Sequence, residues 1–180
     1  SDDGFEWFGG TVDAKHLVVT NFAAEVGDDL FDWTEGWIGN GENWYGIRTN
    51  GGNRGIEADN NSNNEAATPI SNPNIKNLTL IGNNGGGENQ ALKLRVGTKG
   101  SFDNVVLKNW GTGFDVQAAP DLSSGYVGTS LKATNVKFEN VTTQANATAT
   151  GIFTENANAT GAGNGSAAPT WTAGWTVGLE

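Results

Sequence analysis

The sequence of 180 residues contains no cysteine, no methionine and a single histidine, His16. The absence of cysteine excludes disulfide frameworks, thiol catalysis and thiolate metal sites, and one histidine excludes a multi-histidine zinc site. Basic residues are also few, with 10 Lys and Arg against 20 Asp and Glu, which gives a net charge of −10. Because nucleic-acid binding needs a basic surface, this balance argues against a nucleic-acid partner.

Long apolar runs are absent as well. No stretch approaches the 18 or so consecutive apolar residues of a membrane span, so we expect none. Gly and Asn are abundant, at 27 and 23 residues, and interrupt almost every ten residues of the chain. Because no sustained helical stripe survives these interruptions, the sequence predicts little or no helix. The length suits one domain with a sizeable core.

An apolar–charged–apolar triplet recurs five times along the chain. The copies are Phe5-Glu6-Trp7, Phe31-Asp32-Trp33, Ile56-Glu57-Ala58, Leu92-Lys93-Leu94 and Phe114-Asp115-Val116. A second unit follows each triplet, an alternating apolar strand beside Asn, with clear copies at residues 77–80, 104–109 and 135–140 and looser ones at 17–21 and 44–47. Short strands of period 2 in a repeat of this length predict an all-β solenoid of parallel strands with about five coils.

In such a solenoid each triplet stacks on its equivalent one coil away, at a spacing of about 4.8 Å. The flanking apolar residues then fill the interior, and the middle residue faces outward. Asn suits the corner after the second strand because it tolerates the left-handed backbone conformation, and its amide can bond to the next copy. We therefore expect residues 1–141 to form the coils and the low-complexity residues 142–180 to form an outer coil and a C-terminal cap.

Three runs carry a resemblance to a known family. Residues 31–37, 95–100 and 113–116 resemble the repeats of right-handed parallel β-helix proteins from bacterial cell surfaces. The resemblance implies a right-handed parallel β-helix and an extracellular or cell-surface location. It identifies no catalytic residue.

The first triplet begins at residue 5, with nothing before it to act as a cap. An open solenoid end exposes unpaired backbone and apolar interior. We expect this end either to continue into further chain or to pack on a partner.

The acidic residues concentrate in residues 1–65, which hold 13 Asp and Glu against 3 Lys and Arg. Clustered carboxylates can hold a hard cation such as Ca²⁺, whereas the alternative is a solvated acidic surface. The metal ligands that we predict are Asp29, Asp32, Glu35, Glu57 and Asp59.

The outward column of the triplets contains the ingredients of a polysaccharide lyase. Parallel β-helix lyases hold Ca²⁺ with carboxylates against an acidic sugar and remove a proton with Arg or Lys, roles that Asp32 and Glu57 as ligands and Lys93 or Arg95 as base would fill. Stacked carboxylates would also suit a retaining glycoside hydrolase by their separation. The alternative is an outward polar ladder that any solenoid strand requires.

Trp37 and Trp44 flank a Gly- and Asn-rich loop and could offer flat faces to sugar rings, together with Asp32 and Glu57. Alternatively, these aromatic rings anchor their own loop. The leading hypothesis is a non-catalytic, structural or adhesive surface module that binds a polysaccharide or cell-surface glycan. The alternatives are a Ca²⁺-dependent lyase or a carboxylate-pair hydrolase, followed by ice binding, for which a regular Thr-x-Thr ladder is lacking.

Overall fold

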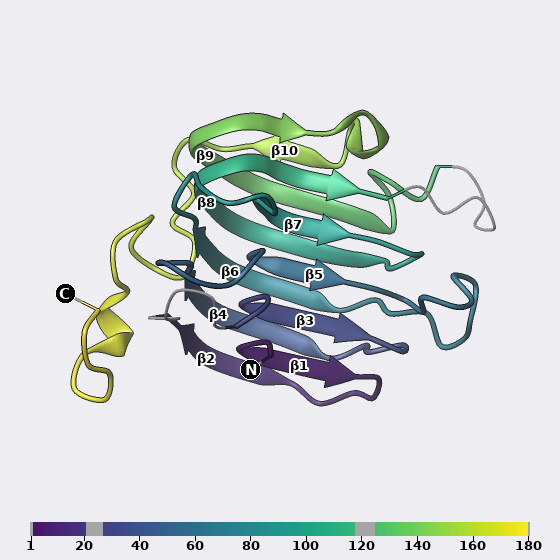
Figure 1. Ribbon diagram of the computed structural model, residues 1–180, viewed down its shortest axis with the longest axis horizontal. Helices are drawn as coiled ribbons and strands as arrows, with labels where there is room; N and C mark the ends of the chain where they lie inside the picture. The colour runs from purple at the N-terminus through teal and green to yellow at the C-terminus, as the bar shows by residue number, and fades with distance from the viewer. Residues whose placement is uncertain (1, 21–26, 118–124, 180) are drawn as a thin grey trace.

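The fold is a parallel β-helix, seen in a computed structural model that describes residues 2–20, 27–117 and 125–179. Its strands stack one above another, with the N-terminal coil at one end of the stack (Figure 1). All the strand pairs between named elements are parallel. The predicted all-β architecture of parallel coils is confirmed, and Asn21, the last residue of the predicted strand at 17–21, lies outside the described residues.

Each coil contributes a short strand from the triplet and a longer, bent strand. The strands are β1 (Phe5–Phe8), β2 (Ala14–Val19), β3 (Phe31–Thr34), β4 (Asn40–Ile47), β5 (Ile56–Ala58), β6 (Asn74–Ile81), β7 (Gln90–Leu94), β8 (Gly100–Val116), β9 (Leu131–Ala145) and β10 (Phe153–Glu155). Two 3-10 helices, η1 (Ala147–Ala149) and η2 (Thr170–Thr172), follow β9 and β10. Within the described ranges no helix has the length and apolar character needed to cross a lipid bilayer.

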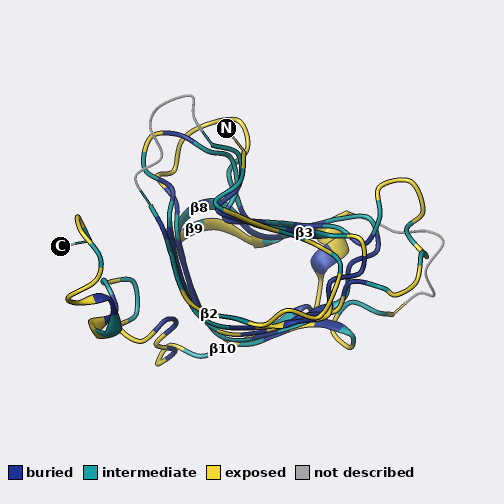
Figure 2. Ribbon diagram, turned by 90° about the horizontal axis from the view of Figure 1, so that it is seen from below, coloured by how far each residue is buried: buried dark blue, intermediate teal, exposed yellow. Residues whose placement is uncertain are grey.

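The triplets stack in the register that the sequence predicts. Phe5 pairs with Phe31, Phe31 with Ile56, Ile56 with Leu92, and Leu92 with Phe114. The charged centres form the neighbouring column of Glu6, Asp32, Glu57, Lys93 and Asp115. Viewed along the stack, these triplet strands form one wall of the coil, on the side labelled β3 (Figure 2).

Each bent strand turns at one residue in the left-handed conformation. The residues at this turn have φ between 53° and 60° and stack on one another: His16, Asn43, Asn77, Asn104 and Asn135. Their side chains form a ladder, in which Asn77 Nδ2 donates to Asn43 Oδ1 at 2.9 Å and Asn104 Nδ2 donates to Asn77 Oδ1 at 2.8 Å. The predicted corner after the strand also exists, where Asn140 Nδ2 donates to Asn109 Oδ1 at 2.9 Å. Asn fits both turns because it accepts a positive φ and bridges successive coils.

The interior is an aromatic stack, and it contains the two Trp residues that the sequence suggested as a sugar platform. Trp37 and Trp44 have no exposed surface, and their rings lie 4.8 and 5.0 Å from the ring of Trp7. Their indole N–H groups donate to the backbone oxygens of Val12 and Ala14, both at 3.0 Å. The prediction that these two rings bind sugar is therefore wrong. Trp44 stacks in the interior column of Leu17 and Leu78, which is why its ring points inward.

The segment after β10 runs along the outside of the bent strands (Figure 1). Ala162 N donates to Thr79 Oγ1 at 2.9 Å, and Thr79 Oγ1 donates to the backbone oxygen of Gly165 at 2.9 Å. A Cβ on Gly161 would lie 2.2 Å from Thr79 Oγ1, so only glycine allows this close approach. The segment covers Thr79 and Val106, which point away from the core but have no exposed surface.

The buried stack makes a direct prediction for stability. Trp33 has no exposed surface and contacts Trp37 and Phe102, so Trp33→Ala should lower the free energy of unfolding by about 3–5 kcal/mol. Trp175, which is 57% exposed, is the matched control, and Trp175→Ala should change stability far less. Urea unfolding of the two variants measures the difference, and equal losses would contradict this assignment of the core.

Candidate functional site

The outward side of the triplet wall carries a group of carboxylates that we call the acidic cluster: Asp3, Glu6, Asp29, Asp32 and Glu57. Register places Glu6, Asp32 and Glu57 in one column, because each is the middle residue of its triplet. Two sets of three carboxylates in the cluster have oxygen atoms within 4.8 Å of one another: Asp3, Glu6 and Asp32, and Asp29, Asp32 and Glu57.

A second column, which the sequence analysis missed, lies two residues before each triplet. Asp3, Asp29 and Arg54 occupy this position in successive coils. Asp3 Oδ1 accepts a hydrogen bond from Asp29 N, and Asp29 Oδ1 accepts one from Arg54 N, both at 2.7 Å. Each side chain thus caps the backbone of the next coil. The sequence did contain a signal for this column, because Asp3 and Asp29 each lie two residues before a triplet, which begins at Phe5 and Phe31 respectively.

Asp29 is the most deeply buried of these acids, with a side chain that is 1% exposed. Its Oδ2 atom accepts no hydrogen bond from the described residues, although Arg54 Nη1 lies 3.6 Å away. Burial and the adjoining Glu57 carboxyl group raise the pKa of Asp29 well above its ordinary range. A buried carboxylate oxygen that accepts no hydrogen bond is costly, so the site favours a proton or a cation at this atom.

Asp32 belongs to both sets of carboxylates. Burial is the main cause that raises its pKa to about 8, and repulsion from Asp3, Glu57 and Glu6 adds to the effect. The pKa of Asp3 is also raised, chiefly by burial. The surroundings of the cluster therefore disfavour the charged forms of these carboxyl groups.

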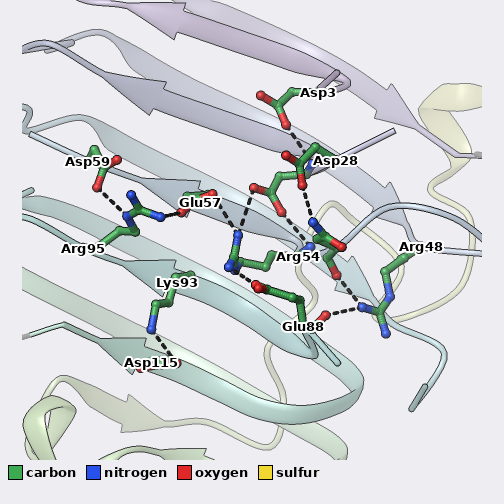
Figure 3. Close-up of polar contacts among 12 residues, drawn as sticks. Asp3, Asp28, Arg48, Arg54, Glu57, Asp59, Glu88, Lys93, Arg95 and Asp115 are labelled. Carbon is green, nitrogen blue, oxygen red and sulfur yellow. Dashed lines mark hydrogen bonds and ion pairs between the residues drawn. The ribbon is translucent and has the colours of Figure 1, made fainter. Parts of the chain in front are cut away.

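Two arginines supply the positive charge at the edge of the cluster (Figure 3). Arg54 pairs with Glu57 at 2.8 Å and with Glu88. Arg95 pairs with Glu57 and, at 3.1 Å, with Asp59. Glu57 is consequently shared between two guanidinium groups.

Arg48 holds in place the loop that carries Glu88. Its guanidinium group is 2% exposed, donates to the backbone oxygens of Asn53, Gly85 and Glu88, and lies 5.0 Å from the Trp110 ring. Because Glu88 in turn binds Arg54, a chain of contacts links Arg48 to Arg54 and the acidic cluster. Sequence reasoning did not find Arg48, Arg54 or Glu88, since they lie outside the triplets and the alternating strands on which it relied.

The predicted metal ligands are only partly brought together. Asp29, Asp32 and Glu57 meet in one set of carboxylates. Glu35 is exposed at the turn after β3 and belongs to none of the acidic groups found in the described ranges, so its inclusion is corrected. Asp59 also lies outside those groups, and it is bonded to Arg95.

The two candidate bases lie beside the cluster but are both occupied. Lys93 Nζ lies 2.9 Å from Asp115 Oδ2, the next residue in the outward column. Arg95 is bound to Asp59 and Glu57. In this arrangement both candidate bases are ion-paired with carboxylates.

The donor set fits a hard divalent cation. Ca²⁺ takes six to eight oxygen ligands, and carboxylates that bind through one or both oxygens are its usual protein ligands. Asp29, Asp32 and Glu57 offer such oxygens within 4.8 Å of one another, one of them buried and without a hydrogen bond. A cation held there would neutralise the cluster and supply open coordination positions for an anionic ligand.

Residues 1–176 match the family described as the pectate-lyase like beta helix domain. The match includes every strand and the whole acidic cluster. No curated protein matches the chain, and no solved structure does.

The raised pKa of Asp32 predicts a pH dependence of stability. Between about pH 4 and pH 8 the folded state binds more protons than the unfolded state, so the free energy of unfolding should fall as the pH rises through this window. The slope from this group is at most about 1.4 kcal/mol per pH unit. Asp32→Asn should reduce the slope, whereas Asp103→Asn, on the bent strand β8, should leave it in place. Urea unfolding at pH 5 and pH 8.5 in EDTA measures both, and equal stability of the unsubstituted protein at the two pH values would contradict the assignment.

Proposed function

The chain belongs to the pectate-lyase-like β-helix family, and from this premise we propose that it is an extracellular or cell-surface module that binds an acidic polysaccharide through a divalent cation. The observation that carries the proposal is the set of Asp29, Asp32 and Glu57 oxygens within 4.8 Å, with one buried oxygen that accepts no hydrogen bond. These three residues would hold the cation, and its chemistry would be to bridge protein carboxylates to the carboxylates of the glycan.

The proposed cation is what selects an acidic class of glycan. A uronate-rich chain would be repelled by the acidic cluster alone, so a cation is required for it to bind. Arg95, whose side chain is 33% exposed, lies at the edge of the cluster and could bind a further carboxylate of the same chain. The Trp37 and Trp44 rings are buried and play no part in this proposal.

Binding is favoured over elimination because both candidate bases are paired. Lys93 would have to leave Asp115, and Arg95 would have to leave Glu57 and Asp59, before either could take a proton from a sugar. The proposed role of the module is accordingly structural or adhesive.

One observation favours a hydrolase as the second candidate. Asp32 and Glu57 are direct neighbours in adjacent coils, and their surroundings differ. The pKa of about 8 keeps Asp32 protonated at neutral pH, as a general acid requires, while Glu57 pairs with two arginines. Such a division between two adjacent carboxyl groups is typical of retaining glycoside hydrolases.

Thermal unfolding in EDTA and in excess Ca²⁺ tests the cation site. At a Ca²⁺ concentration of 100 Kd, binding to the folded state alone adds about 2.7 kcal/mol, or roughly 5–10 °C in Tm for a chain of this size. Asp32→Asn and Glu57→Gln should each abolish the increase, and Asp103→Asn should keep it. An unchanged Tm in Ca²⁺ would refute the cation site.

Polygalacturonate separates the candidate functions. We expect calorimetric binding in Ca²⁺ that disappears in EDTA and in Asp32→Asn, without chain cleavage. Ultraviolet absorbance from unsaturated uronate, lost in Lys93→Ala or Arg95→Ala, would indicate a lyase instead. New reducing ends without that absorbance, lost in Asp32→Asn and Glu57→Gln, would indicate the hydrolase.

A further inference from the structure

The Arg54 side chain lies where a cation bound by the acidic cluster would have to lie. Its Nη1 atom is 2.8 Å from Glu57 Oε2 and 3.6 Å from Asp29 Oδ2. Both carboxyl groups belong to the set of three whose oxygens lie within 4.8 Å of one another. Because the Arg54 side chain is only 11% exposed, its charge acts mainly on these neighbours rather than on solvent. The guanidinium group is therefore the resident cation of Asp29 and Glu57.

A divalent ion and the Arg54 guanidinium group compete for this place. Ca²⁺ lies about 2.3–2.6 Å from its ligand oxygens, and Arg54 Nη1 is within 3.6 Å of oxygens of the same two carboxyl groups. Positive charges at such separations repel strongly where solvent is largely excluded. An ion bound by Asp29 and Glu57 therefore requires the guanidinium group to move away from them.

Glu88 offers Arg54 a second partner outside the set of ligands. Figure 3 shows Arg54 between Glu57 and Glu88, and its Nη2 atom pairs with Glu88 Oε2. The Glu88 side chain is 47% exposed and belongs to none of the acidic groups found in the described part of the chain. Once Nη1 is released, it can turn to the other oxygen of Glu88 and complete the two-pronged pair that arginine forms with carboxylates.

The backbone that carries Glu88 is held independently of the cluster. Arg48 is buried and donates to the backbone oxygens of Gly85 and Glu88 and, at 2.6 Å, to Asn83 Oδ1. None of these contacts involves Asp29 or Glu57. We therefore expect Glu88 to keep its place whether Arg54 or a divalent ion occupies the cluster.

We propose that Arg54 is a built-in competitor for the cation site, which a divalent ion displaces from Asp29 and Glu57 onto Glu88. This inference rests on the cation site of the proposed function. A divalent ion can displace Arg54 because it brings two positive charges to the carboxyl groups, where the guanidinium group brings one. Arg54 and Glu88 would accordingly set the affinity of the site, Arg54 by opposing the ion and Glu88 by retaining the displaced side chain.

Calorimetric titration of Ca²⁺ into the full chain, without polysaccharide, tests the proposal. Arg54→Gln should tighten Ca²⁺ binding about tenfold or more, because the competitor is removed. Arg95→Gln is the matched control, since it removes the same charge beside the same Glu57 but leaves Arg54 against Asp29. It should tighten binding by about threefold or less. Glu88→Gln should weaken binding by about threefold, because the displaced Arg54 loses its partner.

The double variant separates displacement onto Glu88 from a general effect of charge. If Glu88 acts by receiving Arg54, Glu88→Gln should change the affinity by less than about twofold in the Arg54→Gln background. It should keep its full effect in the Arg95→Gln background. If both residues act only through the field of their charges, the effects should add in every background, and that result would overturn the proposal.

The outcomes distinguish this proposal from the proposed function. Ca²⁺ binding by the unsubstituted protein that Arg54→Gln does not tighten would overturn the competitor and leave the cation site standing. Ca²⁺ binding by Arg54→Gln but not by the unsubstituted protein would support the competitor and refute the proposed function. Binding by neither would overturn both. Should Arg54→Gln fail to fold, an unchanged affinity in Glu88→Gln would by itself overturn the proposal.

Discussion

The structure depends on one constraint, the stacking of parallel strands in register at the spacing of backbone hydrogen bonds. Every residue of a coil lies directly against its equivalents in the coils above and below. Apolar equivalents gain from this arrangement, because each column becomes a continuous part of the core. Asn equivalents also gain, because each amide donates to the next one along the ladder.

Acidic residues at equivalent positions of successive coils are not stabilised by stacking, because their charges repel one another. The acidic cluster is the consequence of this stacking. Glu6, Asp32 and Glu57 must be neighbours once their triplets are in register. Farther along the column Lys93 and Asp115 alternate in sign and form an ordinary ion pair. The fold therefore concentrates uncompensated charge in the N-terminal coils, where a proton, a cation or a basic partner would each lower the free energy.

The proposed cation site follows from that same imbalance. On the triplet wall, Asp29, Asp32 and Glu57 lie close enough to share a divalent ion with an acidic glycan.

The sequence by itself determined the repeat, the register of the triplets and the columns that face inward and outward. These follow from a period of two along each strand and from the spacing of equivalent residues, both of which are local properties of the chain. The stacked carboxylates Asp32 and Glu57 and the neighbouring Lys93 were predictable for the same reason.

Only the tertiary structure decided which loop residues join the repeat and which aromatic rings are buried. Trp37 and Trp44 looked available because they flank a loop, yet both rings lie in the core, Trp37 directly after the turn at Gly36 and Trp44 directly after the turn at Asn43. Glu35 is close to Asp32 in sequence but is exposed at the turn after β3, while Glu88 reaches Arg54, at the edge of the cluster, from a distant loop. Side-chain direction at a turn and contact between loops depend on packing among coils, which periodicity along one strand does not contain.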